Sequence, residues 1–330
     1  MKAAWYEQLG PAADVLQIGE HPEPQPAAGE VRVRIHVSAV NPSDTKRRTG
    51  RSVSASAFAR VIPHQDGAGV IDAVGDGVDR ARIGERVWVY EANLGRPFGT
   101  AAQFTTVPAR KAVPLPAGVS FEEGACLGIP AMTAHRCVFA DGPVTGQQVL
   151  VQGGAGAVGY YAVQMARQGG AERVIATVSR DEQAERALEA GAHAVINRRS
   201  EDVAARVRAL CGQAAPLDRV IEVSFGANLL TDVALLGPGG VIATYASDAV
   251  LEPALPFPPL LQKNLTVRFV LVYAMSEQAH RDAADWISRA LAEGRLRHQI
   301  AGVFALDDIV AAHEATESMS QVGKVLVRID

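Results

Sequence analysis

Hydrophobic and polar residues alternate along short segments in the first third of the chain. Between residues 31 and 37, valine or isoleucine occupies every second position, and arginine or histidine lies between them. This period of two is typical of a strand with one buried face, and residues 86–90 and 104–107 are further strand candidates. Residues 67–77 form an apolar run that glycines interrupt. We therefore predict a mainly β region up to about residue 120.

From residue 123 to residue 275 the pattern becomes a repeated unit of strand, glycine turn and helix. Buried strands are predicted at residues 149–152, 174–178, 194–196, 220–223, 241–245 and 267–272. Helices are predicted between them at residues 158–167, 181–189, 201–210 and 228–236. Six strands that alternate with helices predict an α/β protein with a doubly wound parallel sheet. After residue 275 we predict an amphipathic helix at 283–293, a strand at 302–305, a helix from 307 and a closing strand at 324–329.

Composition limits the class of protein. The chain has 330 residues, of which 48% are hydrophobic and 21% charged. This is enough for roughly two globular domains and excludes a disordered or collagen-like chain. The three cysteines, Cys126, Cys137 and Cys211, are odd in number and far apart, which is typical of a reducing compartment. They cannot supply a structural zinc site made of four cysteines.

Charge and hydropathy limit the partners. Lysine and arginine total 32 against 36 aspartates and glutamates, so the net charge is -4 and no basic stripe indicates nucleic acid or anionic lipid. No apolar run suits a signal peptide or a membrane span. We expect a soluble cytoplasmic protein with a small-molecule substrate.

The strongest chemical motif is the glycine-rich segment at residues 149–159, which joins a predicted strand to a predicted helix. A dinucleotide pyrophosphate requires a tight turn, a backbone with little side-chain cover and the free N–H groups of a helix N-terminus. The segment meets these requirements and predicts a cofactor site. The alternative is that its glycines only allow the strand and helix to pack closely. The candidate residues are Gly154, Ala155, Gly156, Ala157, Val158 and Gly159.

The end of the next strand indicates which dinucleotide binds. An acidic residue there would favour NAD, but the chain has Thr177, Val178, Ser179 and Arg180. A hydroxyl followed by a guanidinium suits a 2′-phosphate, so we predict NADPH as the cofactor. Ser179 with Glu182 also fits a helix capping box, and both interpretations can hold together.

Motifs along almost the whole chain resemble one family. They include NPSD at 41–44, DGAGVI at 66–71, GERV at 84–87, GIP at 128–130, the glycine turn and GK at 323–324. In this order they resemble the medium-chain dehydrogenase/reductases, in their zinc-independent quinone oxidoreductase (zeta-crystallin-like) branch. The resemblance implies a GroES-like catalytic domain from residues 1–122 and 276–330, with a Rossmann NADPH-binding domain at 123–275 between them. It also implies a homodimer or homotetramer.

The zinc-dependent members of that family hold a catalytic zinc with cysteine and histidine. The positions that line up with those ligands are Asn41, Gln65 and Ile129, none of which is a soft or imidazole donor. The resemblance therefore implies that no metal binds. His64 lies beside one of these positions, and we interpret it as a loop histidine with an ordinary hydrogen bond.

The resemblance also implies a catalytic group. Asn41 and Asp44 match the family, but Lys46 and Ser52 stand where related quinone reductases have tyrosines. Lys46 could polarise a carbonyl or donate a proton, or it could be a solvated lysine in the basic run at 46–48. Thr133 aligns with a threonine near the nicotinamide, and its alternatives are a helix N-cap or a core threonine.

Further cofactor contacts follow from the same resemblance, because this fold binds ligands at the carboxyl ends of its strands. The expected residues are Arg198 near the adenosine, then Phe225, Tyr245, Ser247, Phe269 and Leu271. Tyr245 and Phe269 could equally belong to the core. Lys324 is interpreted as a surface charge at the start of the last strand.

The predicted activity is NADPH-dependent hydride transfer to a quinone or a similar activated carbonyl, without zinc. Reduction of the double bond of an enone or 2-enoyl substrate is an alternative, because the same cofactor turn serves that branch. A third possibility is an NADPH-binding protein with little turnover, which the loss of both tyrosines keeps open.

Overall fold

The computed structural model describes residues 1–51, 58–212, 215–318 and 321–329, and the chain divides into two compact units. Unit 1 comprises Met1–Ile129 and Ala284–Asp330, and unit 2 comprises Pro130–Ala283. The divisions fall within helices α4 (Gly128–Phe139) and α10 (Glu277–Ala292). We keep the sequence-based domain limits as a proposal. Among the described residues, no helix is long and apolar enough to cross a membrane.

Unit 1 is built on a sheet in which neighbouring strands come from both ends of the chain. The strand order is β14-β15-β3-β4-β5-β7, β6 also pairs with β3, and β1 pairs with β2. The strands are β1 (Lys2–Trp5), β2 (Gln17–Glu20), β3 (Glu30–Val40), β4 (Asp66–Val74), β5 (Arg86–Val89), β6 (Phe104–Pro108), β7 (Ala112–Pro114), β14 (Ile300–Ala305) and β15 (Lys324–Arg328). The helices are α1 (Ala12–Val15), α2 (Pro42–Arg48), α3 (Phe121–Ala125) and α11 (Ile309–Ser318).

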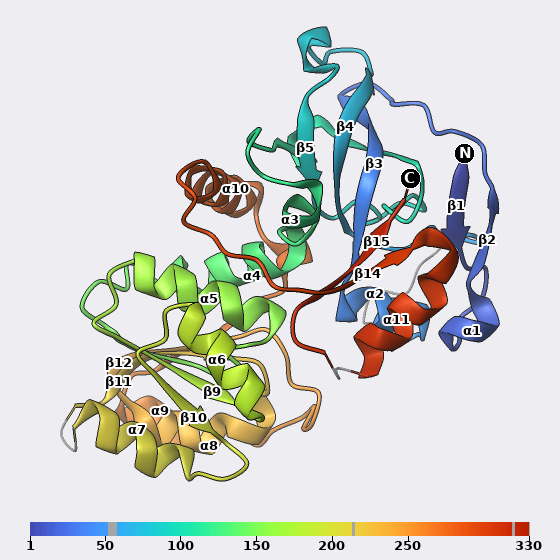
Figure 1. Cartoon of the computed structure of the whole chain (residues 1–330). Coiled ribbons are helices and arrows are strands. Elements are labelled where there is room, and N and C mark those ends of the chain that lie inside the picture. The colour runs from blue at the N-terminus through green and yellow to red at the C-terminus, as the bar shows by residue number, and fades with distance from the viewer. Residues whose placement is uncertain (52–57, 213–214, 319–320, 330) are drawn as a thin grey trace. The chain divides into compact units, whose positions relative to one another are not determined.

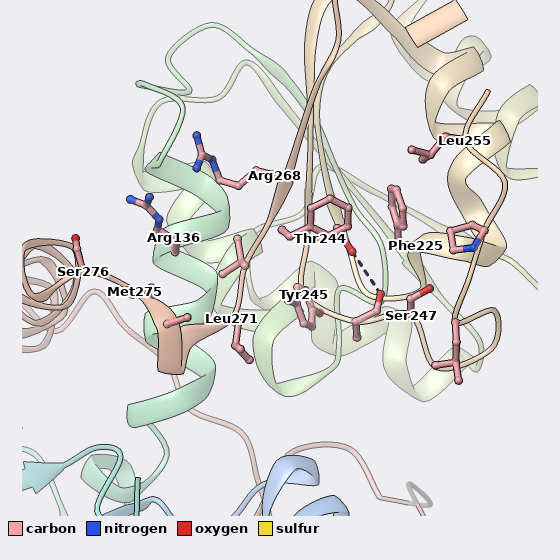
Figure 2. Close-up of a pocket in the computed structure, with 16 residues that line it drawn as sticks. Arg136, Phe225, Thr244, Tyr245, Ser247, Leu255, Arg268, Leu271, Met275 and Ser276 are labelled. Carbon is pink, nitrogen blue, oxygen red and sulfur yellow. Dashed lines mark hydrogen bonds between the residues drawn. The ribbon is translucent and has the colours of Figure 1, made fainter. Parts of the chain in front are cut away.

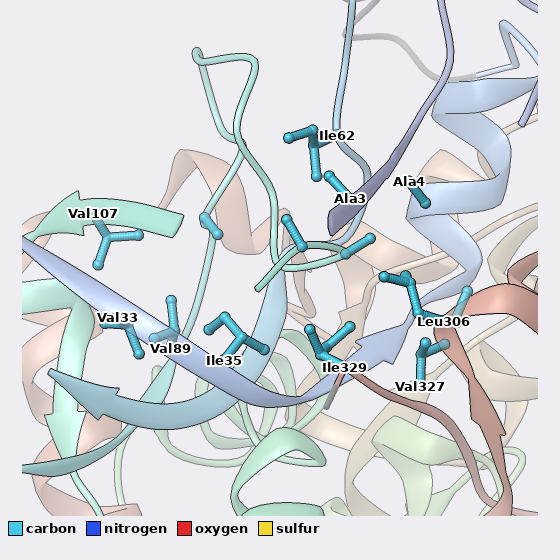
Figure 3. Packing of buried hydrophobic residues seen from close by; sticks show 14 of the residues in the cluster. Ala3, Ala4, Val33, Ile35, Ile62, Val89, Val107, Leu306, Val327 and Ile329 are labelled. Carbon is cyan, nitrogen blue, oxygen red and sulfur yellow. The ribbon is translucent and has the colours of Figure 1, made fainter. Parts of the chain in front are cut away.

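The alternating segment at 31–37 forms the central strand β3, as predicted. Its valines and isoleucine are buried on one face. They pack with side chains from the far end of the chain, and Figure 3 shows Val33 and Ile35 in one cluster with Val327 and Ile329. Because β15 pairs with β3 in antiparallel register, Val325 lies opposite Val40. The C-terminal strand thus completes the core that the N-terminal strands begin.

Unit 2 contains the predicted parallel sheet, with strand order β10-β9-β8-β11-β12-β13 and every neighbouring pair parallel. The strands are β8 (Gln148–Val151), β9 (Arg173–Val178), β10 (Ala194–Asn197), β11 (Leu217–Glu222), β12 (Leu236–Thr244) and β13 (Thr266–Phe269). The helices are α5 (Ala157–Gln168), α6 (Asp181–Glu189), α7 (Val203–Cys211), α8 (Phe225–Leu235) and α9 (Phe257–Gln262). Helices α5 and α6 lie on one face of the sheet, and α7, α8 and α9 lie on the other (Figure 1).

The strand order places the glycine turn at a special position. The chain runs outward from β8 to β9 and β10, and then returns to the other side of β8 at β11. In doubly wound sheets, ligands bind at this reversal, outside the carboxyl ends of the strands. The turn between β8 and α5 lies there. The fold therefore confirms the predicted α/β class and leaves the glycine motif where a dinucleotide would bind.

Two local predictions are wrong. Helix α6 has Arg180 at its N-cap position, not Ser179. The backbone N–H and the hydroxyl of Ser179 both donate to Oε1 of Gln183, at 2.9 and 3.0 Å, so the expected capping box with Glu182 does not form. Strand β13 ends at Phe269, and Val272–Ala274 form a 3-10 turn, because the chain bends there to enter the segment before α10.

Candidate functional site

The glycine turn is held against the end of β9 by two hydrogen bonds. The N–H of Gly153 donates to Oγ1 of Thr177 at 3.0 Å, and the N–H of Gly154 donates to the Thr177 carbonyl at 2.9 Å. A Cβ on Gly154 would lie 2.5 Å from Cβ of Ala176, and one on Gly159 would lie 2.2 Å from the Gly153 carbonyl oxygen. Close packing is thus a real requirement at positions 154 and 159.

The remaining residues of the turn suit an anion. Gly156 is exposed at the N-cap of α5, and Ala157 and Val158 are half-buried in the first helical turn. The N–H groups of a first helical turn have no partner within the helix, and the helix dipole favours negative charge there. Ala155 is buried beneath them. The packing function and the binding function therefore belong to different residues of one motif.

The residues predicted for the adenosine end come from two adjacent strands. β9 and β10 are parallel neighbours with Val178 opposite Asn197, and the N–H of Arg198 donates to the Val178 carbonyl at 2.9 Å. Ser179 and Arg180 are half-buried, and Arg198 is exposed. The structure thus brings a hydroxyl and two guanidinium groups to one edge of the sheet. Two guanidiniums are suited to a phosphate dianion.

Unit 2 also contains a cavity of about 700 Å³ at the ends of β12 and β13 (Figure 2). The residues predicted for the nicotinamide half, Tyr245, Ser247, Phe269 and Leu271, line it, and so does Phe225, which was predicted with Arg198 on the adenosine side. Sequence reasoning missed other residues of its wall, among them Arg136, Thr244, Leu255, Arg268 and Met275. They lie on segments whose local pattern carries no ligand signal, and only the fold gathers them.

The cavity wall is mostly aromatic and apolar, with two arginines. The rings of Phe225 and Phe269 meet edge to face at 5.5 Å between centroids. Phe269 is 72% exposed in the single chain, so the alternative of a core residue is wrong. Tyr245 is half-buried, and low-dielectric surroundings raise its pKa well above the usual range, so it stays a neutral phenol. Arg268 is paired with Asp141.

Unit 1 contains a buried polar cluster around Asn41. Its Nδ2 donates to Oδ2 of Asp66 at 2.8 Å, and its Oδ1 accepts a hydrogen bond from the Lys324 ammonium. The same ammonium lies 3.5 Å from Oδ2 of Asp66, and the N–H of Ile129 donates to both Asp66 oxygens at 3.0 and 3.1 Å. The charges of the Asp66 carboxylate and the Lys324 ammonium thus compensate each other inside the unit, and the Asn41 amide is hydrogen-bonded to both.

The prediction that Lys324 is a surface charge is therefore wrong, because Lys324 is only 4% exposed. It begins β15, whose antiparallel pairing with β3 sets it beside Asn41, at the end of β3. A lysine at the start of a strand, followed by three apolar residues at 325–327, was the available signal. The signal is weak, because a strand start is as often exposed as buried.

Asp44 lies next to this cluster, at the start of helix α2. Its Oδ2 accepts a hydrogen bond from the Asn41 N–H at 2.8 Å. Burial raises its pKa to about 7, and the Asn41 N–H partly offsets this effect. The structure therefore brings two predicted catalytic residues together and gives one of them a titration near neutral pH. Perturbed carboxyl groups of this kind cluster at functional sites.

The basic run at 46–48 is not a solvated stretch. Lys46 is half-buried, while Arg47 and Arg48 are buried. Nη1 of Arg47 donates to Oδ1 of Asn93 at 2.9 Å, and Arg48 pairs with Glu317. Both arginines are buried because helix α2 packs within unit 1, and the two interpretations of the half-buried Lys46 stay predictions. Ser52 lies outside the described residues.

Thr133 lies in the second turn of α4 and is 5% exposed, so it is not a helix N-cap. It belongs to unit 2, whereas Asn41, Asp44 and Lys46 belong to unit 1. Its burial agrees with the alternative of a core threonine. Its role as a hydrogen-bond donor near the nicotinamide stays a prediction.

The residues at the positions of family zinc ligands do not fit a zinc ion. Asn41 faces the Lys324 ammonium, Ile129 offers only its N–H, and neither side-chain polar atom of Gln65 has a partner among the described residues. His64 is fully buried and bonded to Ser38 at 2.8 Å. In the described part of the chain, no three His, Cys, Asp or Glu side chains gather closely enough to hold a metal.

Comparison with protein families gives two matches. Residues 27–117 match the alcohol dehydrogenase GroES-like domain, and residues 157–289 match the family described as zinc-binding dehydrogenase. The first match confirms the predicted GroES-like fold, and the parallel sheet of unit 2 is the Rossmann-like part.

Curated relatives include several quinone oxidoreductases. The protein of Rattus norvegicus is 29% identical, with 92% of this chain and 90% of the relative covered. That of Salmonella typhimurium is 31% identical, with 95% of each covered. The 2-methylene-furan-3-one reductase of Solanum lycopersicum is 34% identical over 54% of this chain and 47% of the relative.

Solved structures agree over the whole chain. An NAD-dependent alcohol dehydrogenase superposes with a TM-score of 0.91 at 27% identity, with 100% of both chains covered. The quinone oxidoreductase of Thermus thermophilus, which was also solved in complex with NADPH, superposes with a TM-score of 0.84 at 29% identity, again with 100% of both covered.

Proposed function

Because this chain belongs to the medium-chain dehydrogenase/reductase family, with quinone oxidoreductases among its relatives, we propose that it reduces a quinone or similar activated carbonyl with NADPH and without zinc. The observation that carries the proposal is the cofactor edge of unit 2. There an open glycine turn lies beside Ser179, Arg180 and Arg198, and the aromatic cavity lies at the end of the same sheet.

The cofactor would extend along the carboxyl ends of the strands. The pyrophosphate would meet residues 154–159, at the first turn of α5, whose N–H groups have no partner within the helix. The 2′-phosphate would meet Ser179, Arg180 and Arg198. The nicotinamide half would enter the cavity between Phe225, Tyr245, Ser247, Phe269 and Leu271. A mostly apolar wall would exclude water from the reacting carbon.

When bound, NADPH supplies a hydride, which a quinone accepts at an electron-poor centre. The chain has to orient the acceptor and supply a proton. Asn41, Asp44, Lys46 and Thr133 are the proposed catalytic residues. Asp44 has a pKa near 7 and so carries a proton for part of the time at neutral pH, as a general acid requires. Lys46 would polarise the acceptor oxygen.

The absence of zinc is supported by the chemistry of the aligned positions. A catalytic zinc requires three protein donors from cysteine, histidine or carboxylate. Asn41, Gln65 and Ile129 supply none of these, and the Lys324 ammonium beside Asn41 would repel a metal cation. We therefore propose that fixed polar groups of the protein replace a Lewis acid at this position.

The test is NADPH oxidation with 1,4-benzoquinone, 9,10-phenanthrenequinone, a linear enone and a simple aldehyde. We expect a quinone to be turned over, at a rate that is the same with and without a chelator. NADH is the matched control, and equal turnover efficiency with NADH would refute the preference for NADPH. Stoichiometric zinc, with loss of activity on chelation, would refute the metal-free reaction.

Two other results of this test would each support a different function. The similarity to 2-methylene-furan-3-one reductase favours reduction of an enone double bond as the second candidate, and turnover of the enone alone would support it. Tight NADPH binding with no turnover of any acceptor would instead indicate a binding protein.

We also propose a homodimer or homotetramer in the cytoplasm, with no nucleic acid or membrane partner. Strand β13 is an edge of its sheet, and Phe257 and Leu261 of the preceding helix α9 are exposed in the single chain. Exposed edges and apolar patches are usually covered by a partner. Light scattering of the purified protein tests the assembly, and a monomer at micromolar concentration would refute it.

A further inference from the structure

A buried chain of side chains connects the glycine turn to the end of the neighbouring strand β11. The N–H of Gly153 donates to Oγ1 of Thr177 at 3.0 Å, and the Thr177 hydroxyl donates to Oε1 of Gln152 at 2.8 Å. Nε2 of Gln152 then donates to Oδ1 of Asp232 at 3.2 Å. Asp232 and Glu222 interact, and burial together with the Glu222 charge raises the pKa of Asp232 well above its usual value. We call Gln152, Thr177, Glu222 and Asp232 the turn-bracing network; each is at most 4% exposed.

Each hydrogen bond of the network has a defined direction. Thr177 accepts from the Gly153 N–H and donates its own proton to Gln152. That contact fixes the Gln152 amide with its oxygen toward Thr177 and its nitrogen toward Asp232. The network therefore leaves the Gln152 amide one orientation. In that orientation its nitrogen donates a hydrogen bond to Asp232 of the carboxyl pair.

The two carboxyls must share a proton, because two adjacent buried carboxylates cannot both ionise. Glu222 already accepts from the Ser224 N–H and from Nδ2 of Asn228, at 3.1 and 3.2 Å for its two oxygens. It also lies at the N-terminus of α8, where the helix dipole favours a negative charge. Oδ2 of Asp232 has no donor among the described residues. The proton therefore belongs on Asp232, which donates it to Glu222.

The network connects two parts of the proposed cofactor site. Its Thr177 end holds the first N–H of the glycine turn, and its Glu222 end holds Ser224, directly before Phe225 in the cavity wall. Resting on the proposed NADPH activity, we propose that the turn-bracing network positions the glycine turn for pyrophosphate, with its single proton on Asp232. These are positioning residues, since the network reaches the cofactor through the backbone.

The first experiment removes the link between the turn and the carboxyl pair. Thr177→Val keeps the side-chain shape and loses the hydroxyl, and Thr177→Ser is the matched control that keeps it. We expect Thr177→Val to weaken NADPH binding about tenfold and Thr177→Ser to change it by less than about twofold, as measured by fluorescence titration. Adenosine 2′-phosphate, which lacks the pyrophosphate, should bind both variants as it binds the native chain. Equal weakening of both ligands would overturn the positioning role.

The second experiment tests the place of the proton. In Asp232→Asn, the new amide can accept from Gln152 and donate to Glu222, as a protonated aspartate does. We expect it to keep the native thermal midpoint and NADPH affinity. Glu222→Gln places an amide against the donors of Ser224 and Asn228, so we expect a midpoint lower by about 5 °C and NADPH affinity weaker by about tenfold. The proposal would be overturned if Asp232→Asn had the lower thermal midpoint and the weaker NADPH affinity. It would also be overturned if both variants behaved as the native chain does.

The two experiments separate the inference from the proposed function. If the native chain binds no NADPH, the proposed function fails. The difference in thermal midpoint between Asp232→Asn and Glu222→Gln then still tests which of the two carboxyls carries the proton. If the native chain binds NADPH and Thr177→Val binds it equally well, the inference alone fails.

Discussion

The Lys324 ammonium donates a hydrogen bond to Oδ1 of Asn41 across 283 positions of the sequence. Because an ammonium can only donate, the Asn41 oxygen must face Lys324 and the amide nitrogen must face Asp66. One contact between the two ends of the chain therefore sets the orientation of a predicted catalytic amide and compensates a buried carboxylate.

Removal of that ammonium should destabilise the fold. Lys324→Met keeps the length of the side chain but leaves the Asp66 carboxylate buried without its cation. An unpaired buried charge costs about 3 to 5 kcal/mol, so we expect that loss in the free energy of unfolding, measured with urea. Arg328→Met, on the same strand in an exposed ion pair with Glu122, is the control and should change it by less than about 1 kcal/mol.

Asp66→Asn added to Lys324→Met should recover part of that loss, because an amide carries no charge to compensate. A Lys324→Met variant as stable as the native chain would contradict the pairing.

Arg180 should determine the choice between NADPH and NADH. Arg180→Ala removes a guanidinium from the edge where β9 and β10 end. A charge-assisted hydrogen bond to phosphate should be lost, so we expect NADPH affinity to fall roughly tenfold or more, with NADH affinity nearly unchanged. Arg206→Ala, on the exposed side of α7, is the control. Equal losses for the two cofactors would show that Arg180 does not contact the 2′-phosphate.

The buried pair His64 and His313 should make the fold sensitive to acid. Their Nε2 atoms lie 2.9 Å apart, so one must donate to a bare nitrogen of the other, and both rings are neutral. Burial lowers the pKa of His313 to about 3 and that of His64 well below its usual value. The unfolded chain, with histidine pKa values of about 6.5, then binds more protons than the folded chain as pH falls below that value. The contribution of this pair to the free energy of unfolding is therefore fully present above pH 6.5 and is lost as pH falls toward 3.

As pH falls below 6, each neutral histidine lowers the free energy of unfolding by an amount that approaches about 1.4 kcal/mol per pH unit. Asp44, whose pKa is raised to about 7, contributes the opposite sign between its unfolded pKa and pH 7. We therefore compare the native chain with His313→Phe by urea unfolding at pH 8, 6 and 5. The variant should lose less stability than the native chain between pH 6 and pH 5, and parallel curves would contradict the neutral pair.

Asp44 should appear in the pH profile of turnover. If its carboxyl supplies the proton, the rate falls as pH rises through about 7, where the group ionises. Asp44→Asn should lower the rate and remove that step from the profile, measured under saturating NADPH. A step that persists in Asp44→Asn would assign the proton to another group.

The elements that the sequence predicted best are those with a local signal. Strand β3 alternates at every second residue, and α6 begins and ends at the predicted residues. The glycine turn could also be placed, because a strand, a glycine-rich turn and a helix follow one another without interruption. The cap of α6 was less well predicted, since Gln183 and Glu182 were equally able to reach the preceding N–H groups.

The sequence by itself determined the order of elements, the two kinds of sheet and the residues of the glycine turn, because these depend on neighbours within a few positions. Only the tertiary structure decided which polar residues are buried together. Lys324 reaches Asn41 through the pairing of β15 with β3, and Asp232 reaches Glu222 because α8 packs beside β11. A buried charge depends on partners that are distant in sequence, so no local pattern distinguishes it from a charge on the surface.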